Sequence, residues 1–521
     1  MEDHRQVSTG TTLPPEVSQQ SRPGFLAAIR LHHLTQSVVK ALNKDWHTSK
    51  YTLYATLLVL LTILVVVMYY LNRPVGLDGD IGTYLSVAHQ IQTQGHFVDD
   101  HRVPGFPLLM VLVFAFAGQD NLAAVTLVNV VLFLLATLEI YLLTALVFKR
   151  GWVALLVGLL VGMNILLLSY VEPASPESLA LWLLVSLALA ATLFVYKPRA
   201  RYLWLVTGFT LALFFTRPEW IYVPVPLFAY LLLVAARRRI ARRMLTHALA
   251  SVLLLYTFLG CYIYTNATQN DFVGVTDTTN INAWSKVIQY GMQDEAPPEY
   301  AAIRRIADTY LAQGVTDPRD ILDHEHSLSR HNYALAGAYA QAIIERHPVE
   351  FLAKSIPFAL SSLSYIWLDD PVAPAGLFGP LLVWLQSMLI GLYTWNQLFP
   401  LCAAVWLLLL CWRRTGGLLA VQAMVVVVLL VLYGVILTTV GGFEDYMRLH
   451  LPFSPLLSLV VWGSLLTGLR LALLVIRHGP GAIWITLDEV KNSKGDSQPV
   501  VPYRPAVIRR EHRGWTRIRV K

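Results

Sequence analysis

The sequence predicts an all-α polytopic membrane protein with about 10 to 11 transmembrane helices and further juxtamembrane helices on the external face. Of its 521 residues, 55% are hydrophobic and only 14% are charged. The mean hydropathy of +0.53 lies above the range of soluble globular proteins. Apolar runs of about 20 residues, the length that crosses a bilayer, alternate with short charged segments.

Charge and cysteine content exclude several classes of protein. The net charge of +7 is concentrated in the tails and in short loops, where it indicates membrane orientation and not nucleic-acid binding. Cys261, Cys402 and Cys411 lie in apolar runs without the spacing of metal ligands. Neither a disulfide framework nor a zinc site is therefore predicted.

Residues 1–50 are predicted to form a cytoplasmic tail. Residues 1–23 are rich in Ser, Thr, Pro and Gln, a composition typical of disorder. A basic amphipathic pattern in 25–46 predicts an interfacial helix on the cytoplasmic leaflet. The apolar run 51–71 then acts as a signal anchor, because the residues before it are mostly polar.

The positions of Lys and Arg in short loops predict the topology. We place the basic segments 149–150, 197–201, 237–243, 413–414 and the tail 477–521 in the cytoplasm, with both termini. Seven spans then fill the transmembrane core 51–265, and they are expected at 51–71, 121–148, 152–171, 178–196, 202–216, 220–236 and 244–265. The run 106–118 is too short for a span and is expected as a juxtamembrane or half-embedded helix.

The rest of the chain divides into an external insert and a C-terminal membrane region. The insert is expected over 266–375 and is mostly helical. It begins with the largest polar segment, 266–352, in which 301–314 and 327–347 have helical periodicity. Within 376–476 we expect a span near 390–412, preceded by a surface or broken helix over 351–393. Two further spans, at 416–440 and 451–475, complete this region.

The densest group of ionisable and turn-forming residues lies in the first external loop, 72–120. Asp78 and Asp80 precede apolar residues at helical spacing, which predict an amphipathic helix on the membrane surface: Tyr84, Val87, Ala88 and Ile91. Gly95 ends this helix. The positive end of the helix dipole favours ionised carboxylates, so either Asp can serve as a general base.

This loop resembles the first external loop of GT-C glycosyltransferases, above all the protein-mannosyltransferase and aminoarabinose-transferase branch. The resemblance rests on Asp80 with Tyr84 four residues later, the Ala-bearing helix that Gly95 ends, and the sequence RVPGFP from Arg102. It implies a GT-C-type helical bundle, a polyprenyl-phosphate sugar as donor and Asp80 as catalytic base. The family usually has Glu after this Asp; here Ile81 follows, and Asp78 is the candidate second acid.

Several external residues suit the remaining tasks. Arg102, Arg217 and Arg448 are candidates for the donor phosphate, because guanidinium groups bind phosphate oxygens in pairs and keep their charge. The other substrate-site candidates are Tyr84, Glu172, Glu177, Lys286 and His450. Asp78 and Asp80 can also hold a divalent cation through oxygen ligands, although no metal site is assigned.

The leading hypothesis is an inverting glycosyltransferase that moves a sugar from a polyprenyl-phosphate carrier to a glycan, lipid or protein acceptor. Catalysis takes place on the external face, whether periplasmic, extracellular or lumenal, and the bilayer is a further partner. Activation of the acceptor by one carboxylate predicts inversion without a covalent enzyme intermediate. The alternatives are a secondary transporter, for which Glu139 is the clearest carboxylate within a span, and a non-catalytic lipid-binding protein of the same fold.

Overall fold

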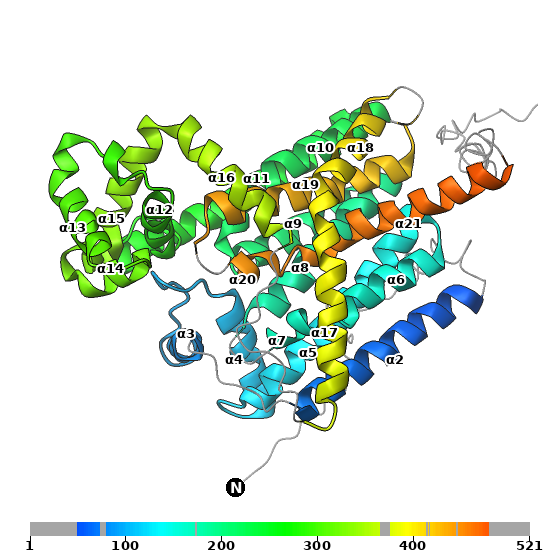
Figure 1. Cartoon of the computed structure of the whole chain (residues 1–521), viewed down its shortest axis with the longest axis horizontal. Coiled ribbons are helices and arrows are strands. Elements are labelled where there is room, and N and C mark those ends of the chain that lie inside the picture. The colour runs from blue at the N-terminus through cyan, green and yellow to red at the C-terminus, as the bar shows by residue number, and fades with distance from the viewer. Residues whose placement is uncertain are drawn as a thin grey trace, which may run out of the picture.

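The computed structural model describes residues 49–72, 80–171, 175–364, 376–412, 415, 417–443 and 446–478 (Figure 1). Its described residues form helices and connecting turns without strands. Asp78, Glu172, the tail residues 1–48 and the tail beyond 478 lie outside the described residues, so the predictions made for them stay predictions.

The membrane-spanning character predicted from composition is confirmed. Within the described residues, eight helical segments are long and apolar enough to cross a membrane, and three shorter apolar helices lie among them. The N-terminal core consists of α2 (Ser49–Asn72), α5 (Leu122–Phe148), α6 (Gly151–Gly162), α7 (Ile165–Ser169), α8 (Glu177–Tyr196), α9 (Ala200–Phe214), η1 (Pro218–Tyr222), α10 (Pro224–Arg237) and α11 (Ala241–Gln269).

Helix α8 lies at the centre of this core. Its residues are apolar on all sides, and most of its side chains are buried. It packs against α5, α9 and the later helix α19 (Leu419–Val440). A helix that is hydrophobic all round belongs in the interior of a bundle, and α8 takes that place. Helices α2, α6 and α21 (Ser454–His478) run in a similar direction to one another (Figure 1).

The first external loop folds as its pattern predicts. Helix α3 (Ile81–Gln94) buries Tyr84, Val87, Ala88 and Ile91, and it ends at Gly95 in the left-handed region, with φ of 69°. Helix α4 (Gly105–Ala117) follows. The Gly105 amide donates to the Phe215 carbonyl at 2.5 Å, and a Cβ on Gly105 would lie 2.6 Å from the Phe215 carbonyl carbon. Glycine thus lets this loop contact the end of α9.

The expected helices of the external insert are present. The insert contains α12 (Thr278–Gln289), η2 (Gln293–Glu295), η3 (Pro298–Tyr300), α13 (Ala301–Ala312), α14 (Pro318–His324) and α15 (His326–Arg346). These elements share a hydrophobic core of their own at one end of the molecule (Figure 1). The Tyr290 hydroxyl donates to the Thr439 carbonyl at 2.9 Å, which connects the insert to α19.

The C-terminal membrane region differs from its prediction in one segment. Helix α16 (Pro348–Ser362) is followed by α17 (Gly379–Tyr393), η4 (Thr394–Leu398) and α18 (Phe399–Cys411), so the helical segment begins about 11 residues before the expected span at 390. Pro380 and Pro400 lie in the first turns of α17 and α18, where proline favours a new helix start. In Figure 1, α17 runs across the long helices and not along them. The short helix α20 (Tyr446–His450) lies between α19 and α21.

Candidate active site

Asp80 lies between two arginines that come from distant parts of the chain. Its Oδ1 is 2.7 Å from Arg102 Nη2, and its Oδ2 is 2.7 Å from Arg448 Nη1. Arg102 follows Asp80 by 22 residues and Arg448 follows it by 368. The first external loop and α20 therefore meet at this carboxylate.

Glu177 joins Arg448 to the third predicted arginine. Its Oε1 accepts a hydrogen bond from Arg448 Nε at 2.5 Å and another from Arg217 Nη2. Its Oε2 accepts from the Ser175 hydroxyl, and the Glu177 side chain is only 2% exposed. Arg217 Nη1 also lies 3.5 Å from Glu219 Oε1. We call Asp80, Glu177, Glu219, Arg102, Arg217 and Arg448 the ion-pair cluster.

Each member of the ion-pair cluster from the bundle lies at a helix boundary. Glu177 is the first residue of α8, where the positive end of the helix dipole stabilises a carboxylate. Arg217 lies between α9 and η1, and Arg448 lies on α20 between two spans. Ionisable groups inside a bilayer are costly, and placement at helix ends removes them from the apolar middle of the spans.

Local contacts orient Arg102. Asp99 Oδ1 accepts hydrogen bonds from the backbone amides of His101 at 2.9 Å and Arg102 at 2.7 Å, which fixes the turn. Arg102 Nε donates to Thr83 Oγ1 at 3.0 Å, and its guanidinium carbon lies 4.6 Å above the centre of the Tyr84 ring. Tyr84 is therefore a platform for the arginine that faces Asp80.

The two arginines control the charge of Asp80. Burial alone would raise the pKa of this carboxyl, but the positive charges of Arg448 and Arg102 outweigh it, and the pKa of Asp80 is lowered. The carboxylate is ionised at neutral pH. While both ion pairs are intact, Asp80 is a weaker base than an isolated aspartate.

The described residues do not fit a divalent cation at Asp80. Among them, no group of three His, Cys, Asp or Glu side chains is placed to hold a metal ion. Both carboxylate oxygens of Asp80 face guanidinium groups, which would repel a cation at the same oxygens.

Lys286 and His450 make their contacts elsewhere. Lys286 is fully buried on α12, with Nζ 5.3 Å from the Tyr290 ring centre, and burial lowers its pKa to about 7. His450 follows Arg448 by two residues, and its ring lies 4.4 Å from that of Phe453. Burial lowers the pKa of His450 to about 3, so it is neutral near pH 7 and carries no positive charge toward a phosphate.

Glu139, the carboxylate that the transporter alternative would use, binds neighbouring side chains of the bundle. It accepts hydrogen bonds from Ser186 Oγ at 2.7 Å and from Trp182 Nε1 at 3.3 Å. These contacts join α5 to α8 within the bundle, and a buried carboxyl with two donors is satisfied without a transported ligand.

Sequence reasoning missed the central position of Glu177 and the presence of Glu219. Glu177 was expected only as one of several substrate-site candidates, yet it binds both Arg217 and Arg448. The available signal for Glu219 was its place beside Arg217 in the turn Thr216–Trp220, where Pro218 begins a helix. A carboxylate next to an arginine at such a turn is a candidate partner for it.

This geometry defines a class of site: a carboxylate held between guanidinium groups at the ends of apolar helices. Residues 101–264 match the family described as dolichyl-phosphate-mannose-protein mannosyltransferase. The match includes Arg102, Glu177 and Arg217, but it ends before Arg448. It supports a GT-C membrane glycosyltransferase.

Solved structures with a similar course of the chain are archaeal oligosaccharyltransferases from Archaeoglobus fulgidus. AglB in complex with an inhibitory peptide and a dolichol-phosphate is 12% identical, with a TM-score of 0.42 over 84% of this chain and 55% of that one. The apo oligosaccharyltransferase is 14% identical, with a TM-score of 0.43 over 86% and 55%. The chain thus spans about half the length of these proteins. No curated protein matches the chain by sequence.

Proposed function

We propose that this protein transfers a sugar from a polyprenyl-phosphate carrier to a hydroxyl of a glycan, lipid or protein acceptor on the external face of the membrane, with inversion at the anomeric carbon. The observation that carries the proposal is the position of Asp80 between Arg102 and Arg448. A candidate base and two candidate phosphate ligands are in direct contact there.

Donor binding must exchange ion pairs. The cluster contains three carboxylates and three guanidinium groups, so it is electrically neutral when all three carboxylates are ionised. A phosphodiester carries one negative charge and competes with carboxylates for the same guanidinium protons. We infer that the donor phosphate takes over Arg448 or Arg102 from Asp80, because Asp80 is the more exposed carboxylate at 28%, against 2% for Glu177.

This exchange links donor binding to the strength of the base. The charges of Arg448 and Arg102 hold the pKa of Asp80 down. When the phosphate neutralises one of them, that pKa rises and Asp80 becomes a better proton acceptor. The base is thus strengthened only when a donor is present, which limits unproductive reaction.

The chemical step then balances as a single displacement. Asp80 accepts the proton of the acceptor hydroxyl. At the same time, the hydroxyl oxygen of the acceptor forms a bond to the anomeric carbon of the sugar. The bond between that carbon and the phosphate oxygen breaks, and the electron pair leaves with the polyprenyl phosphate. The leaving phosphate gains negative charge, which Arg448, Arg217 or Arg102 stabilises where it develops. Attack opposite the leaving group inverts the anomeric centre.

An apolar cavity supports a lipid-linked substrate. It measures about 290 Å³ between α6, α17 and α21, and nearly all of its lining surface is apolar. Its lining residues are Leu156, Leu159, Leu160, Met163, Met388, Leu389, Leu392, Trp462 and Leu466. An isoprenoid chain would meet almost only apolar groups there, as a lipid tail requires.

The proposal is tested with purified protein in nanodiscs and a panel of polyprenyl-phosphate sugars. We expect saturable binding of at least one donor and release of its polyprenyl phosphate when a hydroxyl-bearing acceptor is supplied. Asp308→Asn, an exposed carboxylate of the insert, is the matched control and should behave as wild type. Failure of wild-type protein to bind any member of the panel would overturn the proposed donor class.

A further inference from the structure

Helix α12 of the external insert contacts, at its two ends, the chain segments that carry Arg102 and Arg448 to Asp80. It lies on the side of the insert nearer the transmembrane helices (Figure 1). Asp277 precedes its first residue and Tyr290 follows its last. The helix has 12 residues and is therefore about 18 Å long. One short helix thus reaches both sides of the ion-pair cluster.

At the first end of α12, Asp277 binds the turn that precedes Arg102. The Asp277 amide donates to the Asp100 carbonyl at 2.8 Å, and Asp277 Oδ1 lies 2.8 Å from His101 Nδ1. The Asp277 side chain is only 9% exposed. In the same turn, the Asp99 carboxylate accepts from the amides of His101 and Arg102. The position of Asp277 therefore constrains the backbone that bears the Arg102 guanidinium.

At the second end of α12, Tyr290 binds the end of α19. Its hydroxyl donates to the Thr439 carbonyl at 2.9 Å, and Tyr290 is buried. Two residues beyond α19, the backbone of Gly442 packs against Leu449 so closely that a Cβ at Gly442 would collide with that side chain. Leu449 directly follows Arg448 on α20. The contact of Tyr290 is thus connected to Arg448 through a short, closely packed segment.

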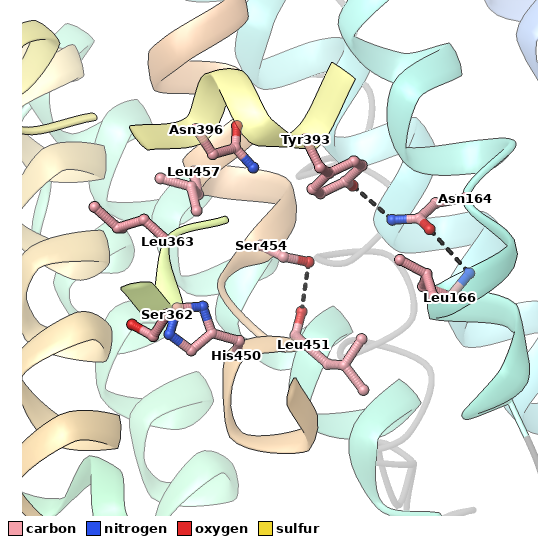
Figure 2. A pocket seen from close by; sticks show the side chains of 10 residues that line it. All are labelled: Asn164, Leu166, Ser362, Leu363, Tyr393, Asn396, His450, Leu451, Ser454 and Leu457. Carbon is pink, nitrogen blue, oxygen red and sulfur yellow. Dashed lines mark hydrogen bonds between the residues drawn. The ribbon is translucent and has the colours of Figure 1, made fainter. Parts of the chain in front are cut away.

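Helix α16 supports the same side of the site. Lys354 of α16 donates to the Tyr290 carbonyl at 2.9 Å, and α16 also packs against α20. Ser362, at the end of α16, and His450, at the end of α20, line one cavity of about 30 Å³ (Figure 2). The Tyr290 end of α12 is therefore held on both sides, by α16 and by α19.

We propose that α12 positions both arginines that face Asp80, one through each of its ends. The first external loop and α20 lie outside the long spans, so a common support limits their movement relative to each other. Asp277 and Tyr290 are positioning residues, because they act through Arg102 and Arg448. A shift of about 1 Å at a catalytic group can lower a rate about 10²-fold, which gives such a support functional weight. Only the effect on donor binding rests on the proposed function.

Hydrogen exchange of the donor-free protein in nanodiscs tests the first end of α12. Asp277→Ala removes the carboxylate that contacts His101. Amide exchange should then rise about tenfold in the peptide 96–104 and stay unchanged in 446–453. Asp277→Asn retains an oxygen that accepts from His101 and should exchange as wild type does. Asp308→Ala, at an exposed carboxylate of the same insert, is the control and should change neither peptide.

The second end of α12 is tested in the same way. Tyr290→Phe removes only the hydroxyl, so exchange should rise in 446–453 and stay unchanged in 96–104. Tyr310→Phe, on α13, is the matched control. Wild-type exchange in both peptides for Asp277→Ala and Tyr290→Phe would overturn the inference. So would a rise that extends through 301–346, because it would mark loss of the insert's fold and not loss of one contact.

Donor binding distinguishes a positioning role from a purely structural one. Asp277→Ala and Tyr290→Phe should each raise the donor Kd about tenfold, less than loss of an arginine, because a displaced guanidinium still attracts the phosphate. In an Arg102→Ala background, Asp277→Ala should cause no further loss of affinity. Fully additive losses would overturn the assignment of Asp277. If wild-type protein binds no donor, the proposed function fails, and hydrogen exchange still decides the inference.

Discussion

Replacement of Glu177 by Gln removes one charge from the ion-pair cluster and preserves the size of the side chain. Glu177 Oε1 receives both Arg448 Nε, at 2.5 Å, and Arg217 Nη2. The substitution therefore leaves two guanidinium groups without their shared carboxylate. The variant therefore distinguishes the contribution of the Glu177 carboxylate to stability from the contribution of the arginines to donor binding.

The expected loss of stability follows from burial. The Glu177 side chain is 2% exposed, Arg448 is 15% exposed and Arg217 is 12% exposed. Removal of one partner from a buried ion pair costs about 3–5 kcal/mol. Because both arginines retain some contact with solvent, we expect the lower end, about 3 kcal/mol. Glu219→Gln is the matched control, since Glu219 is 24% exposed and 3.5 Å from Arg217, and it should cost about 1 kcal/mol or less.

Donor binding should respond in the opposite direction. The cluster changes from neutral to a charge of about +1, which favours a phosphodiester anion. We expect chemical denaturation in detergent to give a lower stability for Glu177→Gln, and equilibrium binding in nanodiscs to give an unchanged or tighter donor Kd. Wild-type stability of Glu177→Gln would refute the account of the cluster as a buried network. If the donor Kd of Glu177→Gln rises as much as that of Arg448→Ala, the assignment of stability to Glu177 and of donor binding to the arginines is refuted.

Three other predictions concern the phosphate, the pH dependence and the topology. Arg448→Ala and Arg217→Ala should each weaken donor binding by about 2–5 kcal/mol in the same assay, and normal affinity in both would remove them from the site. Folding favours the neutral form of His450, because burial lowers its pKa to about 3. The contribution of His450 to the free energy of unfolding is therefore fully present above pH 6.5 and is lost as the pH falls. From pH 6.5 to 5 the loss should approach about 2 kcal/mol in wild type and vanish in His450→Phe, as denaturation at each pH would measure. In a background without native cysteines, Gln313→Cys should react with an impermeant thiol reagent in intact cells, whereas Ala200→Cys should react only after permeabilisation; external labelling at Ala200 would reverse the proposed orientation.

Short-range features of the site were predictable from the sequence. Helical spacing gave the buried face of α3, including Tyr84, and Gly95 marked its end. Arg102 follows Asp80 within one loop, so their contact needs only a helix and a turn. Five of the seven spans expected in the N-terminal core are helices long and apolar enough to cross a membrane, because apolar length is a local signal. The runs expected at 152–171 and 202–216 contain the shorter apolar helices Gly151–Gly162 and Ala200–Phe214.

Contacts between distant segments were not predictable in the same way. The sequence indicated that Arg448 lies near the end of a span, but the pairing of Arg448 with Glu177 across 271 residues depends on how the helices pack. Helix α17 ends at Tyr393, within the surface or broken helix expected over 351–393, but Gly379–Cys411 taken together is long and apolar enough to cross a membrane. Apolar length alone therefore does not fix where the span begins.

The most direct test of the central claim is a single-turnover measurement on Asp80→Asn with a donor that wild-type protein uses. Asparagine matches aspartate in size, but its single carbonyl oxygen can accept at only one of the two positions that face Arg102 and Arg448, and it cannot take the proton of the acceptor hydroxyl. The account predicts that donor binding is retained and that the rate of sugar transfer falls by about 10²–10⁴-fold, whereas Asp308→Asn transfers at the wild-type rate. Transfer by Asp80→Asn at the wild-type rate would contradict the assignment of Asp80 as the base.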